Sequence, residues 1–241
     1  MAEYLVRDTT LISLSDSIRS LGNTTKSLSM SEMKTVVDEA IIREDGIIDE
    51  STNAIQNNRV TSIRQYSFYK NQSLSTVNFP SAVIVDSYAF YKCDSLVTTN
   101  IPLVESIGVF SFRGCSSLIL ADFPLVTTIG QGCFDECIAL SSVNLPLVTV
   151  IEPLTFRKCE GLTTVDLPVV TSIGSQAFYS SGITSLTLRS DTVCTLDNAD
   201  AFYFTPIEEG VGYIYVPSDL VDSYKTANGW STYANQIIAI A

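Results

Sequence analysis

The chain has 241 residues, of which 46% are hydrophobic and only 17% charged, a balance that predicts a packed core rather than a disordered chain. A formal net charge of −12 argues against nucleic-acid binding and against attraction to anionic membranes. The chain has no histidine, which excludes His-dependent triads and imidazole metal sites. No apolar run of about 18 residues predicts a membrane span.

The first 45 residues have the pattern of a small helical module. Leu14, Ile18 and Leu21 follow helical spacing, and Gly22 is a candidate C-cap. A second run with apolar residues at helical spacing spans residues 31–42. We interpret residues 1–45 as an attachment module. Because residues 1–10 contain no apolar stretch of the signal-peptide kind, the sequence as written predicts no cleaved secretion signal.

A 22-residue repeat occupies roughly residues 46–205, and we call each repeat a rung. One column of the repeat is phenylalanine: Phe68, Phe90, Phe112, Phe134, Phe156 and Phe178. Leucine stands six positions after Phe, proline twelve after, and isoleucine or valine seventeen after. Cysteine stands three positions after Phe in four rungs: Cys93, Cys115, Cys137 and Cys159. A unit this short cannot bury its apolar side alone, so the repeat predicts a solenoid of stacked rungs.

Each rung contains one predicted strand. Positions nine and eleven after Phe are mostly apolar, as in Val77 and Phe79, and this alternation predicts a short strand with both residues facing inward. Strands that recur in one direction must pair in parallel, and each ends at a proline, which has no N–H for the ladder. The return segment is too short for a full helix, so we expect extended chain, turns or 3₁₀ there. Gly108, Gly130 and Gly174 suggest turns with positive φ.

The two ends of the array depart from the repeat. At the start, Ile55, Val60 and Ile63 fit a degenerate first rung. Near the end, Leu186 and Leu188 indicate a strand, residues 214–217 read as the final strand, and Ser218 is a candidate N-cap for a short helix. We interpret residues 206–241 as a cap. The apolar end of the stack is expected to be sealed by four residues of this segment: Trp230, Tyr233, Ile237 and Ile238.

The unit AFYKCDSLVTTNIPLVESIG, residues 89–108, resembles the BspA-like leucine-rich-repeat family of the Treponema pallidum type. The shared features are the Ala-Phe pair, the Cys and Leu that follow, a strand ending in Pro, and an Ile-Gly pair. The resemblance covers roughly residues 47–205. It implies a leucine-rich-repeat solenoid, an α/β-type superhelix with short parallel strands on one face and turns or 3₁₀ on the other. It also implies surface or secreted proteins that act in adhesion and protein binding.

The flanking segments carry further resemblances. The segment LVRDTTLISLSDSIRSLGNTTKSLSMSEM, near the N-terminus, resembles a module at the start of phage and prophage tail-associated proteins. The segment VPSDLVDSYKTANGWSTYANQI, near the C-terminus, is similar to closing segments of repeat proteins from gut bacteria and their phages. A phage origin would explain an outside-acting protein without a secretion signal.

The cysteine column is interpreted as packing. Stacked rungs place neighbouring thiols about 4.8 Å apart in a line, whereas a zinc or iron–sulfur site needs ligands that converge on a point. Parallel side chains are also poorly directed for disulfides. We therefore expect buried thiols that act as small hydrophobes, with Cys133 in a neighbouring packing position, and no metal or cofactor.

A polar column on the outward face of the predicted strands is the candidate binding site. Its members, with the hydroxyl residues two positions earlier, are Asn78, Asn100, Asp122, Asn144, Asp166, Thr76, Thr98, Ser142 and Thr164, continued by Ser185 and Thr187, and Leu120 interrupts the hydroxyl series. We call this set the polar strip. These groups could bind sugars or a protein backbone. The alternative is simple solvation of an exposed sheet, with Asn side chains bonding their neighbours along the stack.

Other candidate features favour a structural interpretation. Tyr66, Tyr69, Tyr88 and Tyr91 could stack on sugars or anchor an interface, but half-buried packing on the turn side is the alternative. The acidic pairs 135–136 and 208–209 are interpreted as solvated turn residues. No phosphate-binding loop, dinucleotide fingerprint, nucleophile elbow or metal-ligand spacing occurs, so we expect no enzyme.

The leading hypothesis is a recognition module on a phage tail or cell surface that binds a host-surface protein or glycan. One alternative is a structural component of a virion or surface layer that contacts only sister subunits. A second is an intracellular protein-binding scaffold. The sequence leaves the ligand and the oligomeric state open.

Truncating the phenylalanine column tests the predicted register. Phe134→Ala, at a middle rung, should lower the free energy of unfolding by about 3–5 kcal/mol, as buried Phe truncations do. Chemical denaturation of both proteins gives this difference. A loss below about 1 kcal/mol would show that the column is not buried.

Overall fold

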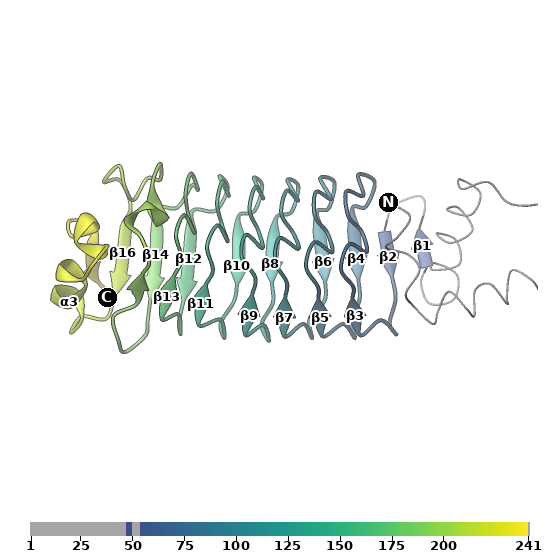
Figure 1. The fold of residues 1–241 in the computed structure, drawn as a ribbon, viewed down its shortest axis with the longest axis horizontal. Helices are drawn as coiled ribbons and strands as arrows, with labels where there is room; N and C mark the ends of the chain where they lie inside the picture. The colour runs from purple at the N-terminus through teal and green to yellow at the C-terminus, as the bar shows by residue number, and fades with distance from the viewer. Residues whose placement is uncertain (1–46, 50–53, 241) are drawn as a thin grey trace, which may run out of the picture. The chain divides into compact units, whose positions relative to one another are not determined.

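A computed structural model describes residues 47–49 and 54–240, so the helical module expected in residues 1–45 lies outside the described part. The rungs form a stack within the compact unit Ile48–Ala241, with the strands of successive rungs side by side (Figure 1). This arrangement confirms the predicted solenoid of short parallel strands.

The first strand of each rung lies on one face of the stack. In chain order these strands are β1 (Ile47–Asp49), β2 (Ala54–Gln56), β4 (Thr76–Asn78), β6 (Thr98–Asn100), β8 (Leu120–Asp122), β10 (Ser142–Asn144), β12 (Thr164–Leu167), β14 (Ser185–Leu188), β16 (Tyr213–Val216) and β17 (Ile237–Ala239). The pairings are parallel and join equivalent positions, as Val77 does with Thr99 and Val143 with Ala121. We call this row of strands the first face.

A second strand of two residues completes each rung. These strands are β3 (Ser62–Ile63), β5 (Ile84–Val85), β7 (Ser106–Ile107), β9 (Thr128–Ile129), β11 (Val150–Ile151), β13 (Ser172–Ile173) and β15 (Thr195–Leu196). They also pair in parallel, as in Ile107 with Ile129. The rest of the return path consists of turns, so the expectation of extended chain and turns is confirmed.

The Phe column forms the centre of the core. Phe90, Phe112, Phe134, Phe156 and Phe178 are fully buried. Neighbouring rings stack with centroids 5.1–5.8 Å apart, and the column continues from Phe68 to Phe202. Offset stacking at this distance adds to the free energy of burying each ring. The leucine and isoleucine columns are buried around it, which confirms the predicted register.

The thiol column is packed in the core and also hydrogen-bonded. The Cys115 thiol donates to the Phe90 carbonyl oxygen at 3.1 Å, and Cys93, Cys137 and Cys159 repeat this contact with the Phe of the preceding rung. All six cysteines are free and buried. Burial raises the pKa of the Cys93 and Cys133 thiols to about 12. These thiols are therefore buried parts of the core.

The prediction of positive φ at Gly108, Gly130 and Gly174 was wrong. None of the three lies in the left-handed region; positive φ occurs instead two residues before and after each Phe, for example at Tyr88 and Lys92. The three glycines are required by close approach between rungs. A Cβ on Gly130 would lie 2.4 Å from the Val109 nitrogen, and the other two glycines face backbone or proline-ring atoms just as closely.

The C-terminal cap closes the core with aromatic residues. It contains η1 (Ala199–Phe202), α3 (Val221–Thr226) and η2 (Trp230–Tyr233). The buried Trp230 indole donates to the Cys194 carbonyl oxygen at 2.6 Å, and the Cys194 amide donates to the Tyr224 hydroxyl at 2.9 Å. Tyr233 packs edge-on against Phe202. The expected sealing role of Trp230, Tyr233 and Ile237 is confirmed, whereas Ile238 is only partly buried.

Two details of the cap differ from prediction. Ser218 is not the N-cap, because α3 begins at Val221 and its N-cap, Leu220, offers no side-chain hydrogen bond. The strand at residues 213–216 is not the last one, since β17 follows and pairs with β16 in parallel. The chain therefore adds one more strand after the short helices, a step that lies outside the 22-residue period.

The close approach at the glycines gives a stability prediction. Gly130→Ala should lower the free energy of unfolding by about 1–3 kcal/mol, because neighbouring backbone must shift to admit the methyl group. Urea denaturation measures the change. The control Gln131→Ala alters the exposed neighbouring side chain and should change stability by less than about 0.5 kcal/mol. Equal stability of the two variants would contradict the close-packing explanation.

Candidate binding face

The polar strip lies on the first face of the solenoid. Its residues occupy the first and third positions of β4, β6, β8, β10 and β12, and the residue between them is inward-facing. Asn100, Asp122, Asn144 and Asp166 are exposed, while Thr76 and Asn78 are half-buried. The strands therefore hold the predicted residues in register on one surface (Figure 1).

Part of the strip is bonded to itself. The Asn100 amide donates to the Asn78 side-chain oxygen at 2.8 Å, and the Asn144 amide donates to an Asp122 carboxylate oxygen at 2.7 Å. The Thr98 hydroxyl donates to the Thr76 hydroxyl at 3.2 Å. Each donor and acceptor here can make further bonds. Some of the strip's hydrogen-bonding groups therefore bond to each other, and the remaining capacity faces solvent.

An arginine that was not predicted belongs to this face. Arg189 donates to both carboxylate oxygens of Asp166, with its Nη2 at 2.8 Å, and about half of each side chain is exposed. Such an exposed pair contributes little to stability, because water screens the two charges. Sequence reasoning missed it because its own rung is one residue short after Phe178, which shifts Arg189 into the position that proline holds in the earlier rungs.

Two tyrosines extend the strip toward the C-terminus. Ser185 pairs with Tyr213 and Thr187 with Tyr215, so both rings occupy the outward positions of β16. Tyr213 is 45% exposed and Tyr215 is half-buried. The alternating pattern of residues 213–216 was a usable signal. The long irregular segment before it concealed that this strand continues the polar strip.

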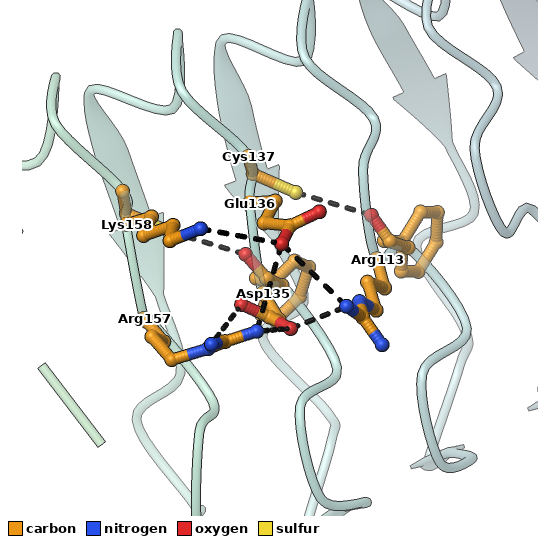
Figure 2. Close-up of polar contacts among 9 residues, drawn as sticks. Arg113, Asp135, Glu136, Cys137, Arg157 and Lys158 are labelled. Atoms are coloured by element: carbon orange, nitrogen blue, oxygen red, sulfur yellow. Dashed lines mark hydrogen bonds and ion pairs between the residues drawn. The ribbon is translucent and has the colours of Figure 1, made fainter. Parts of the chain in front are cut away.

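The turn side of the middle rungs holds an ionic cluster, which Figure 2 shows. Asp135 accepts two hydrogen bonds from Arg157, at 2.8 and 2.7 Å. Arg113 lies on its other side with Nε 2.9 Å from Oδ2, although without hydrogen-bond geometry. The Asp135 side chain is completely buried, so its interpretation as a solvated turn residue was wrong. The three residues are one rung apart, and stacking brings them together.

Glu136 completes the ionic cluster at the surface. Its carboxylate lies 3.5 Å from Arg113 and 3.6 Å from both Arg157 and Lys158. Burial by itself would raise the pKa of Glu136, but the three cations outweigh it and lower that pKa. The hydrogen bond to Asp135 raises the pKa of Arg157. Both carboxylates of the cluster are paired with cations, which favours a structural role.

The tyrosines of the first rungs lie on the same turn side. Tyr88 and Tyr91 are half-buried, whereas Tyr66 and Tyr69 are 44% and 41% exposed. Within the described ranges, no three Cys, Asp or Glu side chains are grouped closely enough to hold a metal ion. No helix in that same part of the chain has the length and apolar character to cross a membrane.

The ionic cluster predicts a pH-dependent contribution to stability. The pKa of Glu136 is below its ordinary 4.5 in the folded state, so ionisation favours folding above that pH and the gain disappears as pH falls through the lowered pKa. Glu136→Gln should therefore lower the free energy of unfolding by about 0.5–1 kcal/mol at pH 7 and by less at pH 3. Urea titrations at both pH values measure this. Glu209→Gln, at an exposed position, serves as control. If Glu136→Gln lowered the free energy of unfolding equally at both pH values, the assignment would be refuted.

Comparison with solved structures places other leucine-rich-repeat proteins beside this chain. A T. pallidum leucine-rich-repeat protein is 20% identical, with a TM-score of 0.40, over 55% of this chain and 84% of that one. A leucine-rich cell surface protein of Faecalibacterium prausnitzii A2-165 is 26% identical, with a TM-score of 0.39. The match covers 61% of this chain and about half, 53%, of that protein. A Bacteroides ovatus leucine-rich-repeat protein is 18% identical, with a TM-score of 0.33, over 75% and 64% of the two chains.

Comparison with curated proteins gives no match. None of the comparisons supports the expected phage tail-associated segment, which precedes the matched residues. The family model for the BspA type leucine rich repeat region matches residues 49–151 and 127–210, with six copies of the repeat. Repeat regions of this type are commonly protein-binding or adhesion modules of surface proteins and are typically not enzymes. Because the model covers more than half of the sequence and the stacked rungs carry its repeat, the chain belongs to the BspA-type leucine-rich-repeat family.

Proposed function

We propose that this chain is a non-catalytic recognition module whose polar strip binds a protein or glycan on a host or cell surface. The observation that carries the proposal is the strip itself: amides, carboxylates and hydroxyls on one row of strands over five rungs, with β4 paired to β6, β8 to β10 and β12 to β14 in register. A preformed surface loses little conformational freedom on binding, so many modest contacts can add up to useful affinity.

The C-terminal end of the strip favours a polar ligand with some apolar surface. Tyr213 adds an exposed ring next to Ser185, and Arg189 adds a guanidinium beside Asp166. Tyrosine supplies contact area and a hydroxyl together, which suits sugars and protein surfaces alike. Leu120 contributes the aliphatic contact in the middle of the strip, where it is 44% exposed.

The proposal places the protein outside the cell, on a cell surface or on a virion. Residues 1–45 would attach the recognition module to its parent assembly, for example a phage or prophage tail. The F. prausnitzii protein, described as a cell surface protein, supports a surface location by analogy. The rungs would then serve as a spacer and a binding face at once.

Charge reversal in the strip tests the proposal. Asp122→Lys with Asp166→Lys should weaken binding to immobilised bacterial cells and to arrayed glycans by roughly tenfold or more, since opposite charge now meets the ligand's complementary groups. Surface plasmon resonance and array binding give the affinities. Asp191→Lys is the matched control, because Asp191 is exposed but lies outside the strip.

Incorporation into particles or the cell surface, measured by mass spectrometry, separates this role from a purely structural one. The recognition role requires lost ligand binding with incorporation unchanged. Lost incorporation with ligand binding unchanged would instead show that the strip contacts sister subunits. Thermal unfolding of each variant confirms that the stack is intact.

A further inference from the structure

The turn side of the first three rungs carries a second surface, distinct from the polar strip. Tyr66, Tyr88 and Phe110 stand two positions before the Phe column, and Tyr69 and Tyr91 stand one position after it. Lys70 and Lys92 stand one position further on and are exposed. We call these seven residues the aromatic–lysine patch.

The rings of the patch form a continuous contact network. Tyr66 stacks on Tyr88 with centroids 5.3 Å apart, and Tyr88 contacts Phe110 at 5.6 Å. In the parallel column Tyr69 stacks on Tyr91 at 5.0 Å. Contacts at 5.4 and 5.6 Å join the two columns within each rung. The outer members, Tyr66 and Tyr69, remain 44% and 41% exposed, so the network lies at the surface.

The backbone does not require aromatic residues at these positions. Tyr66, Tyr88 and Phe110 have φ of 62°, 60° and 53°, a left-handed conformation that is unfavourable for bulky side chains. The next rung has Gly132 in the same place, with φ of 59°. Later rungs have Leu154 and Gln176 there, also with positive φ, so the position does not select for aromatic rings. Stacking accounts for Tyr88 and Phe110, which are half-buried, but it does not explain why Tyr66 is left exposed.

The patch is positive in a strongly acidic protein. Lys70 Nζ lies 5.1 Å from the Tyr69 ring centroid, and Lys92 Nζ lies 6.0 Å from that of Tyr91. Neither lysine is within ion-pair distance of a carboxylate in the described part of the chain. Lys158, at the equivalent position three rungs on, is paired with Glu136. Ammonium groups without a carboxylate partner among the described residues thus lie beside the tyrosine rings, in a chain of net charge −12.

We propose that the aromatic–lysine patch is a binding site for an acidic polysaccharide. Lys70 and Lys92 stand one rung apart, about 4.8 Å, and would pair with successive anionic groups along a sugar chain. The phenolic hydroxyls make no hydrogen bond to another described residue and would bond sugar hydroxyls. The outer surfaces of Tyr66 and Tyr69 would contact the apolar side of a sugar ring.

Two other polyanions fit less well. Successive nucleic-acid bases need a series of free ring faces to stack on, but here neighbouring rings cover one another and leave only the outer surfaces of Tyr66 and Tyr69. An acidic peptide would gain most from an open backbone edge, yet the turn amides already bond to the next rung, as Phe68 N does with Ala89 O and Lys70 N with Tyr91 O. Hydroxyl-rich anionic sugars can use the lysine ammonium groups, the phenolic hydroxyls and the outer ring surfaces.

The test compares defined polymers on the full chain by isothermal titration calorimetry at low and high salt. The probes are polygalacturonate, dextran sulfate, uncharged dextran, poly-glutamate and single-stranded DNA. We expect saturable, salt-sensitive binding of polygalacturonate or dextran sulfate and none of uncharged dextran. Preference for polygalacturonate assigns carboxylated sugars, and preference for dextran sulfate assigns sulfated ones. Equal or tighter binding of poly-glutamate or DNA overturns the assignment to a polysaccharide.

Variants locate the site. Lys70→Ala with Lys92→Ala should weaken binding roughly tenfold, as loss of two exposed charge contacts does, and Tyr66→Ala should weaken it several-fold, on the order of one aromatic contact. Lys158→Ala is the matched control and should bind normally. Loss in the lysine variant alone, with Tyr66→Ala unaffected, would mean unspecific charge attraction and would overturn the proposal. So would the absence of binding to every acidic polymer. Circular dichroism confirms that each variant is folded.

Discussion

Parallel pairing in strict register places each residue beside its counterpart 22 positions along the chain, and the other features of the molecule depend on this constraint. It turns one phenylalanine per repeat into a continuous ring stack, and one cysteine per repeat into a column of thiols bonded to Phe carbonyls. The core is therefore one-dimensional, and its stability comes from interfaces between neighbouring rungs. The glycines that permit the close approach are part of the same constraint.

Register also determines what happens to residues that break the repeat. Arg113, Asp135 and Arg157 differ in type but share one column, so stacking buries a carboxylate between two guanidinium groups. A buried charge without such partners would be strongly destabilising. The same column holds Tyr69 and Tyr91 in earlier rungs, where the rings stack and remain partly open. Along the stack, this one column therefore changes from partly exposed aromatic rings to ion-paired charged side chains.

The two proposed binding surfaces differ in physical character. The polar strip is carried by strands, and its groups bond partly to one another, which fixes their positions. The aromatic–lysine patch is carried by turns, with stacked rings supporting lysines that have no carboxylate partner in the described residues. A solenoid can hold both because different positions of the repeat supply the strand residues and the turn residues of each rung. Separate ligands on separate sides could bind without competing.

Periodicity alone determined the stacked rungs, the inward residues, the burial of the Phe and Cys columns and the outward position of the polar strip, because a repeat in sequence becomes a ladder in space. Contacts between unlike residues of one column required the tertiary structure. The burial of Asp135 depends on the arginines one rung away on each side, and the need for Gly130 depends on the Val109 backbone beside it. The positions of Arg189 and Tyr213 follow from irregular spacing that no column predicts. The sequence thus specified the features that repeat, and three-dimensional packing decided which neighbours the non-repeating residues contact.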